Sequence, residues 1–350
     1  MSGHSGTTLP GSGSGPSDGA DALTGAVRDA ARLLADARDV TLLAHINPDA
    51  DALGSALALG RALRGRGASV RVAFGSPEET PVSLRELDGD GLIVPPGEVP
   101  AAPPLLVCCD AGSLQRLGRL ANRVAGTIAA GGEVLVLDHH ANNTMFGTRH
   151  VVDDTAEATV LLVLRVLDEL GVQLDEPIAR CLYAGLVTDT GMFRRARAGT
   201  HRVAARLVEA GVEPAVLTRS LMDTHPFSFL PMLSEVLGRA RLEPEEARGA
   251  GLVHAVVRLA DSAEVRSEEL DSVIDVVRTA QEAEVAAVLK ETAPDRWSVS
   301  LRSDGGMDVA KAANLCGGGG HRFAAGFTAD GTAEEVLRSL RGALREAPFT

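Results

Sequence analysis

The sequence predicts an α/β protein, with a doubly wound parallel sheet in the N-terminal half and a smaller α/β domain after it. Three observations predict this class. Short apolar runs alternate with segments of helical period, which is typical of parallel sheets. Three of these runs end directly in aspartate or histidine. A second group of strand-like and helical segments follows residue 239, so the C-terminal part is expected to have its own core.

Length and composition place the chain among two-domain proteins. Its 350 residues are enough for two cores, and no apolar run approaches the roughly 20 residues of a membrane span. Residues 1–20 are rich in Gly, Ser, Thr and Pro and lack the apolar core of a secretory signal, so we expect a disordered tail. The four cysteines form no C-x-x-C pair, which indicates a reducing cytoplasm.

The charge limits the classes of substrate. A net charge of −13 argues against a protein that coats long duplex nucleic acid, because such binding depends on neutralising phosphates. One Trp and one Tyr offer few stacking surfaces for long single strands. A short anionic substrate, held in a local pocket together with metal, remains compatible with this composition.

The first predicted strand, residues 40–44, leads into a dense group of polar residues. His45, Asp49 and Asp51 follow it, and a helix is expected over residues 52–64. Ligands bind at this edge of open α/β sheets, and His and Asp at close spacing suit a hard divalent cation such as Mn²⁺ or Mg²⁺. A structural interpretation also exists, since Asn-Pro-Asp favours turns and aspartate can cap a helix.

Two further apolar runs end in the same way. Residues 105–109 are followed by Asp110, and residues 134–137 by the triplet Asp138, His139 and His140. Because the carboxyl ends of parallel strands meet at one edge of the sheet, we expect these side chains to converge on a metal site.

Most of the sequence around these strands has the pattern of helices. We expect helices over residues 22–37 and 177–192, a strand over residues 69–74, and a helix capped by Asp154 and Thr155 that runs to about residue 170. Asp189 lies near a helix C-terminus, where the macrodipole disfavours a carboxylate, so a cation partner is expected. Gly191 as a simple helix stop is the alternative.

The C-terminal part predicts strands at residues 252–259, 283–290 and 297–302, and helices at 271–279, 308–315 and 333–344. Helical segments at 200–237 suit a linker, and residues 241–250 suit a turn region. Residues 317–320 are four glycines, followed by His321 and Arg322. Glycine backbone N–H groups with His and Arg favour a phosphate cradle, although a glycine run also suits a flexible linker.

Taken together, these motifs resemble the DHH phosphoesterase superfamily. The H-x-N-P-D-x-D-x-x-G-S segment from His45, Asp110, the triplet at 138–140 and T-D-T-G at 188–191 match its signature motifs, and the glycine run resembles that of the DHH-associated domain. The resemblance spans about residues 25–345. Within the superfamily, the chain is similar to the NrnA-type bifunctional oligoribonuclease (nanoRNase) and pAp phosphatase group, where pAp is 3′-phosphoadenosine 5′-phosphate.

The resemblance implies a role for each motif residue. His45, Asp49 and Asp110 would bind one Mn²⁺, and Asp51, Asp110, His139 and Asp189 the second, with Asp110 bridging. Mg²⁺ or Co²⁺ are possible substitutes. Asp138 would orient an imidazole, and His140 would face the substrate phosphate or assist the leaving oxygen. Arg302, Gly319, Gly320 and His321 would hold the terminal phosphate and neighbouring sugar.

The resemblance also implies the domain organisation and the substrate. Residues 21–198 would form the DHH metal-binding catalytic domain, 199–238 a helical linker and 239–350 the DHH-associated substrate-binding domain, with the active site in the cleft between the domains. The implied activity is two-metal hydrolysis of short 5′-phosphorylated oligoribonucleotides to mononucleotides, and of pAp to AMP. Relatives are commonly dimers, so a homodimer is possible.

Other activities share the same motifs. Cyclic-di-AMP or linear dinucleotide hydrolysis needs no different metal ligand. An inorganic pyrophosphatase would share the N-terminal motifs, but the glycine run with His321 argues against it. A catalytically inactive nucleotide-sensing regulator would be expected to have lost a ligand, and none is lost. Whether Arg194, Arg195 and Arg197 contact substrate or only solvent stays open at this point.

Overall fold

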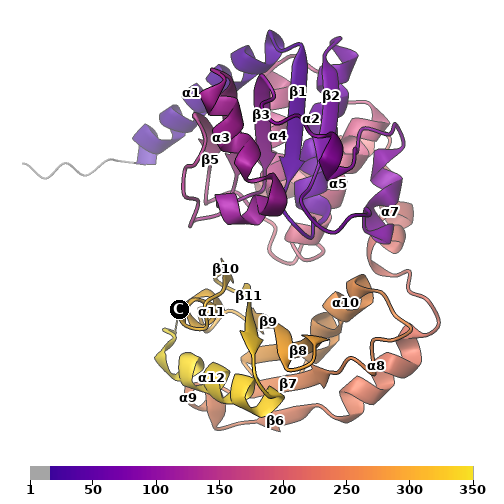
Figure 1. The fold of residues 1–350 in the computed structure, drawn as a ribbon, viewed down its shortest axis with the longest axis vertical. Helices are drawn as coiled ribbons and strands as arrows, with labels where there is room; N and C mark the ends of the chain where they lie inside the picture. The colour runs from indigo at the N-terminus through magenta and orange to yellow at the C-terminus, as the bar shows by residue number, and fades with distance from the viewer. Residues whose placement is uncertain (1–15, 350) are drawn as a thin grey trace, which may run out of the picture. The chain divides into compact units, whose positions relative to one another are not determined.

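The computed structural model describes residues 16–349. The chain divides into two compact units between Asp223 and Thr224, and each unit has its own sheet and cores. The predicted fold class, a parallel-sheet domain followed by a smaller α/β domain, is confirmed. Figure 1 shows both units, with labels on most of their helices and strands.

The first unit is built on a parallel sheet with the order β2-β1-β3-β4-β5. The chain runs outward from β1 to one side through β2 and to the other through β3, so the topological switch point lies between β1 and β3. In open α/β sheets ligands bind at the carboxyl ends of the strands beside such a point. The strands are β1 (Asp39–Ala44), β2 (Ser69–Ala73), β3 (Leu105–Cys109), β4 (Glu133–Asp138) and β5 (Arg149–Val152).

Helices cover both faces of this sheet, which explains why its strands are apolar throughout. Leu42 packs into the core on one face and Leu43 into the core on the other, as the two-residue period of a strand requires. One face is covered by α1 (Pro16–Ala35), α2 (Ala50–Gly65), α4 (Thr159–Glu169) and α5 (Glu176–Asp189), and the other by the 3₁₀ segment η3 (Leu114–Leu120) and α3 (Asn122–Ala129). The unit also contains the 3₁₀ segments η1 (Val82–Asp88) and η2 (Pro96–Glu98), and α6 (Ala198–Glu209) and α7 (Pro214–Met222).

Close contact between α2 and α5 depends on two glycines. A Cβ at Gly54 would lie 2.4 Å from the carbonyl oxygen of Cys181, and a Cβ at Gly185 would lie 2.8 Å from Oδ1 of Asp51. Both distances are below van der Waals contact, so only glycine allows this approach. As a result the helix that carries Asp51 lies directly against the helix that ends in Asp189.

The second unit has a mixed sheet with the order β10-β11-β9-β8-β7-β6, in which only the β7–β8 pair is parallel. Its two faces carry separate apolar cores. The core on one face is lined by α9 (Glu246–Gly249), α11 (Val309–Leu315) and α12 (Ala333–Glu346), and that on the other by α8 (Phe229–Gly238) and α10 (Ser267–Val277). The strands are β6 (Arg241–Glu243), β7 (Leu252–Val257), β8 (Val285–Ala293), β9 (Arg296–Ser303), β10 (Gly319–His321) and β11 (Ala324–Asp330).

Several predicted boundaries are corrected by the structure. Helix α4 begins at Thr159, not at Asp154 and Thr155, because the side chain of Asp153 instead closes a turn by accepting hydrogen bonds from the N–H and Oγ1 of Thr155. The expected turn region at 241–250 contains β6 and α9. Strand β5 was not predicted, because its four residues are too few to show a strand pattern in the sequence.

The N-terminal boundary of the described chain differs from the predicted one. Of the predicted tail, residues 1–15 lie outside the described part of the chain, and α1 begins at Pro16, inside the predicted tail. Within residues 16–349, no helix combines the length and apolar character needed to cross a bilayer.

Candidate metal centre

The predicted site residues of the first unit gather at the carboxyl edge of its sheet. His45 directly follows β1, Asp110 directly follows β3, and Asp138 is the last residue of β4. Asp110 adopts a left-handed backbone conformation with a φ of 56°. Asn47, which lies in the turn after His45, does the same with a φ of 50°. Non-glycine residues seldom do so, and such conformations cluster at functional sites. The topological switch point therefore combines unusual backbone conformations with His45 and Asp110, two of the predicted site residues.

The first group of potential metal ligands contains His45, Asp49 and Asp110, with one donor atom from each within 4.8 Å of the others. Nε2 of His45 lies 3.5 Å from Oδ2 of Asp49 and 3.6 Å from Oδ2 of Asp110. Nδ1 of His45 donates to the carbonyl oxygen of Ile46 at 2.7 Å. Since a carbonyl only accepts, Nδ1 carries a proton, so Nε2 faces the carboxylates and is the nitrogen that would bind a cation once it gives up its own proton.

The second group contains Asp51, His139 and Asp189. Nε2 of His139 lies 3.2 Å from Oδ2 of Asp189 and 3.9 Å from Oδ2 of Asp51. Nδ1 of His139 donates to the carbonyl oxygen of Ala156 at 3.1 Å, so a backbone carbonyl again directs Nε2 toward carboxylates. Fixing one imidazole nitrogen in this way is the usual arrangement behind a metal-binding histidine.

Asp110 faces both groups. Its Oδ2 is the oxygen near His45, and its Oδ1 lies 3.5 Å from Nε2 of His139. The carboxylate is almost fully buried, with 4% of the side chain exposed. A carboxylate whose two oxygens face two ligand groups is the arrangement expected of a bridging ligand.

Asp138 fixes its neighbours in the triplet through hydrogen bonds to its carboxylate. Its Oδ1 accepts hydrogen bonds from Nδ1 of His140 at 2.6 Å and from the backbone N–H of His139 at 2.9 Å. Its Oδ2 accepts from the side-chain amide of Asn143. Nδ1 of His140 also lies 3.6 Å from Oδ1 of Asp110, so His140 borders the candidate metal ligands. Of the two imidazoles in the triplet, the one that Asp138 contacts through a hydrogen bond to the ring is therefore that of His140.

The electrostatics of the site favour bound cations. Burial raises the pKa of Asp51 well above its usual value, and the carboxylates of Asp110 and Asp189 raise it further. Burial alone would lower the pKa of His45, but Asp49 and Asp110 outweigh it and raise that pKa to about 10. For His139 the carboxylates likewise outweigh burial and raise the pKa to about 11. The excess of buried negative charge therefore calls for positive charge at this position.

The donor set fits two hard divalent cations. Four carboxylates can offset the charge of two such ions, and oxygen with imidazole nitrogen is the ligand chemistry of Mn²⁺ and related ions. No cysteine belongs to either group, which disfavours a soft-metal site. These residues can hold metal, and metal held there would polarise a bound phosphate and lower the pKa of a bound water.

Comparison with known proteins identifies the family. The family model "DHH family, N-terminal domain" matches residues 39–186, and the "DHHA1 domain" model matches residues 249–347. The chain is 33% identical over 319 residues to the bifunctional oligoribonuclease and PAP phosphatase NrnA of Thermus thermophilus, covering 89% of this chain and 91% of that protein. The chain belongs to the DHH family. Family and relative together make it a phosphoester hydrolase.

Two further similarities agree with this assignment. A probable manganese-dependent inorganic pyrophosphatase of Deinococcus radiodurans is 30% identical over 162 residues, which is 44% of this chain and 48% of that protein. The crystal structure of an exopolyphosphatase-related protein from Bacteroides fragilis superposes with a TM-score of 0.82 at 20% identity and covers 92% of this chain and 96% of that one. The second similarity shows the shared fold.

The DHHA1 unit places its predicted site residues at one corner of the mixed sheet. Residues 319–321 form the edge strand β10, in which His321 pairs with Ala324 of β11, and Ala324 pairs in turn with Arg302 of β9. The glycine run therefore has a structural reason of its own: a Cβ at Gly318 would lie 2.1 Å from the carbonyl oxygen of Gly326. Phosphate binding by Arg302, Gly319, Gly320 and His321 stays a prediction.

Two of the arginines that follow Asp189 have defined partners in the first unit. Arg195 donates to the carbonyl oxygen of Asp189 at 2.5 Å, and Arg197 forms an ion pair with Glu157 at 3.3 Å. Gly191, Met192 and Phe193 before them all have positive φ, between 59° and 63°. The left-handed turn returns the chain over the end of α5, so Arg195 supports the backbone beside a candidate metal ligand.

Two residues at the site were missed by sequence reasoning. Asn143 fixes Asp138, and Thr159 donates its hydroxyl hydrogen to Oδ1 of Asp110 at 2.8 Å. The signal for Asn143 was its place in the polar loop directly after the triplet. No local signal marked Thr159, because it meets Asp110 only through the tertiary fold.

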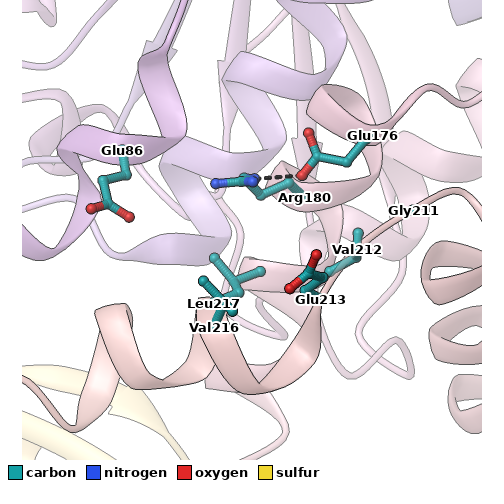
Figure 2. Close-up of a pocket in the computed structure, with 8 residues that line it drawn as sticks. All are labelled: Glu86, Glu176, Arg180, Gly211, Val212, Glu213, Val216 and Leu217. Carbon is teal, nitrogen blue, oxygen red and sulfur yellow. Dashed lines mark hydrogen bonds and ion pairs between the residues drawn. The ribbon is translucent and has the colours of Figure 1, made fainter.

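A cavity elsewhere in the first unit contains none of the predicted site residues. It has a volume of about 240 Å³ and lies beside α5 and α7 (Figure 2). Three glutamates, Glu86, Glu176 and Glu213, surround the single arginine, Arg180, whose Nε donates to Glu176 at 2.6 Å. Its acidic lining makes it unsuited to the phosphate esters that the DHH family hydrolyses.

Proposed function

We propose that this DHH-family enzyme uses two Mn²⁺ ions to hydrolyse short 5′-phosphorylated oligoribonucleotides to mononucleotides and pAp to AMP. The observation that carries the proposal is the placement of Asp110, whose two oxygens face two separate ligand groups. The 33% identity to a bifunctional oligoribonuclease and PAP phosphatase supports the substrate class, and the similarity to a manganese-dependent pyrophosphatase supports the ion.

The assignment of ligands follows the two groups. His45, Asp49 and Asp110 would hold one ion, and Asp51, His139, Asp189 and again Asp110 the other. When bound, such a pair of ions polarises the phosphate and supplies a hydroxide nucleophile at neutral pH. The protein contributes the fixed orientation of the ligands: backbone carbonyls set the tautomers of His45 and His139, and buried surroundings strengthen each charge interaction.

His140 is the residue proposed to handle a proton. Its Nδ1 is held by Asp138, which stabilises the protonated ring and raises the pKa of His140 against the opposing effect of burial. A protonated imidazole beside the metal ligands can donate a hydrogen bond to a phosphate oxygen or a proton to the leaving oxygen. This pairing of imidazole and buried carboxylate supports a role as general acid.

Residues of the DHHA1 unit are proposed to bind the rest of the substrate. Arg302 and His321 supply charged donors, and Gly319 and Gly320 expose backbone N–H groups on an edge strand. Four cysteines without a disulfide among the described residues support a cytoplasmic location. A homodimer is a further proposal, and light scattering of the purified protein tests it.

Turnover of three substrates tests the proposed function. Purified protein with Mn²⁺ should hydrolyse pAp and a 5′-phosphorylated diribonucleotide at least tenfold faster, in kcat/KM, than cyclic-di-AMP. A preference for cyclic-di-AMP would assign the enzyme to cyclic dinucleotide hydrolysis on the same metal ligands. Absence of turnover with all three, in protein that binds Mn²⁺, would refute the substrate class and leave the metal centre intact.

A further inference from the structure

Helix α4 lacks a capping side chain of its own. Its N-cap residue is Ala158, which has an extended conformation and no side-chain acceptor. The first turn of a helix nevertheless has N–H groups without helical partners. Here Asp51 of α2 supplies the acceptors: Oδ2 accepts from the N–H of Thr159 at 2.7 Å and Oδ1 from the N–H of Val160 at 3.0 Å.

This contact fixes a candidate metal ligand rather than only a helix end. Asp51 and Thr159 are both fully buried, and they are separated by 108 residues in the sequence. The positive end of the helix dipole favours the charged form of Asp51, opposing the burial and the like charges that raise its pKa. The backbone of α4 therefore sets the rotation of the Asp51 carboxylate.

The side chain of Thr159 acts on a second candidate ligand. Its Oγ1 lies 2.8 Å from Oδ1 of Asp110. A charged carboxylate only accepts, so the hydroxyl donates. With Oδ1 held in this way, Oδ2 of Asp110 is the oxygen that faces Nε2 of His45, at 3.6 Å.

We propose that Thr159 is a positioning residue that couples the two halves of the metal centre. Its backbone N–H orients Asp51, which belongs to one ligand group, and its hydroxyl orients Asp110, which faces both. One buried residue at the start of α4 thereby fixes the relative orientation of two carboxylates from α2 and from the end of β3. The inference rests on the proposed metal centre.

The hydroxyl can be removed without altering the shape of the residue. Thr159→Val keeps the branched side chain and the backbone N–H, so it should leave Asp51 in place and release only Asp110. Thr159→Ser keeps the hydroxyl and loses the methyl group. Loss of a partner behind a metal ligand typically weakens metal binding ten- to hundredfold, so that range is expected for the valine variant and less than about threefold for the serine variant.

A matched control exists in the same unit. Thr200 is also buried and donates from Oγ1 to a carboxylate oxygen of Glu157 at 2.7 Å, but it belongs to neither ligand group. Thr200→Val removes the same kind of bond. It should leave Mn²⁺ affinity within about threefold of the original protein.

Mn²⁺ binding to the full chain, measured by isothermal titration calorimetry, tests the inference without reference to turnover. The original protein should bind two ions, the Thr159→Val variant should bind them at least tenfold more weakly, and Thr159→Ser should restore affinity. If Thr159→Val fails to fold, as judged by circular dichroism of the metal-free protein, Thr159→Ala and Thr159→Ser provide the same comparison.

The outcomes separate the inference from the function on which it rests. If the original protein binds no Mn²⁺, the metal centre itself is refuted. If the original protein binds two ions and Thr159→Val binds them equally well, only the role of Thr159 is refuted. Equal weakening in the valine and serine variants would assign the effect to packing of the side chain, which also overturns the inference.

Discussion

Replacement of Asp110 by asparagine should separate metal binding from folding. The substitution keeps the size of the side chain and one carbonyl oxygen but removes its charge. Asp110 helps to raise the pKa of Asp51 through repulsion between carboxylates. Removing that charge relieves this repulsion but also removes the attraction between Asp110 and the imidazoles of His45 and His139, whose pKa values Asp110 helps to raise, so the metal-free variant should fold with a stability slightly below that of the original protein.

The magnitude follows from the number of ions that Asp110 faces. Each ion present at 100 times its dissociation constant stabilises the folded state by about 2.7 kcal/mol. In a domain of this size that free energy corresponds to a rise of about 5–10 °C in Tm. Because the oxygens of Asp110 face both ligand groups, we expect the Asp110→Asn variant to lose most of the rise for both ions. Turnover of pAp should fall by at least about 10³, or about 4 kcal/mol of barrier.

Differential scanning calorimetry with and without Mn²⁺ measures this effect. Asp168→Asn serves as the control, since Asp168 is an exposed carboxylate of α4 that pairs with Arg206 and belongs to neither ligand group. The control should retain the full rise in Tm. A Tm rise in Asp110→Asn equal to that of the original protein, or retained turnover, would show that Asp110 is not shared between ions.

Three further substitutions test the glycine-rich strand, the contact between α2 and α5, and the ion pairs of the second unit. His321→Ala should raise the KM for pAp about tenfold and leave Mn²⁺ binding unchanged in calorimetry; unchanged kinetics would remove the glycine-rich strand from substrate binding. Gly185→Ala places a Cβ 2.8 Å from Oδ1 of Asp51, so we expect a loss of about 1–3 kcal/mol in urea unfolding together with weaker Mn²⁺ binding. Normal Mn²⁺ affinity in that variant would show that α5 shifts to accommodate the added Cβ without moving Asp51. Hydrogen bonds from Arg341 lower the pKa of Glu243, against the opposing effect of burial, and His254 lowers it further. This stabilisation is present above the ordinary pKa of glutamate and is lost as the pH falls through the lowered value. Glu243→Gln should therefore destabilise the second unit at pH 7 and make its stability less dependent on pH below 5, measured by urea unfolding; an unchanged acid dependence would contradict this.

The strand ends could be predicted from sequence because their signals are local. Five apolar residues before Asp110 and four before Asp138 identify buried parallel strands, and the geometry of a parallel sheet then brings their ends together. His45 follows in the same way from β1. The convergence of these residues needed no knowledge of tertiary contacts beyond the sheet itself.

The contacts that complete the site could not be predicted because they join distant segments. Thr159 meets Asp51 and Asp110 across 108 and 49 residues, and its helix has an alanine where a capping side chain would mark the start. The glycine run shows a different limit. Its residues predict an anion-binding loop or a flexible linker, and only the strand pairing reveals that Gly318 is also required by the close approach of Gly326.

Anomalous diffraction from crystals grown with Mn²⁺ would show whether Asp110 bridges two ions. We predict two anomalous peaks at the carboxyl edge of the parallel sheet, with Asp110 contacting both ions, His45 and Asp49 one, and His139 and Asp189 the other. A single peak, or two peaks that share no carboxylate, would contradict this prediction.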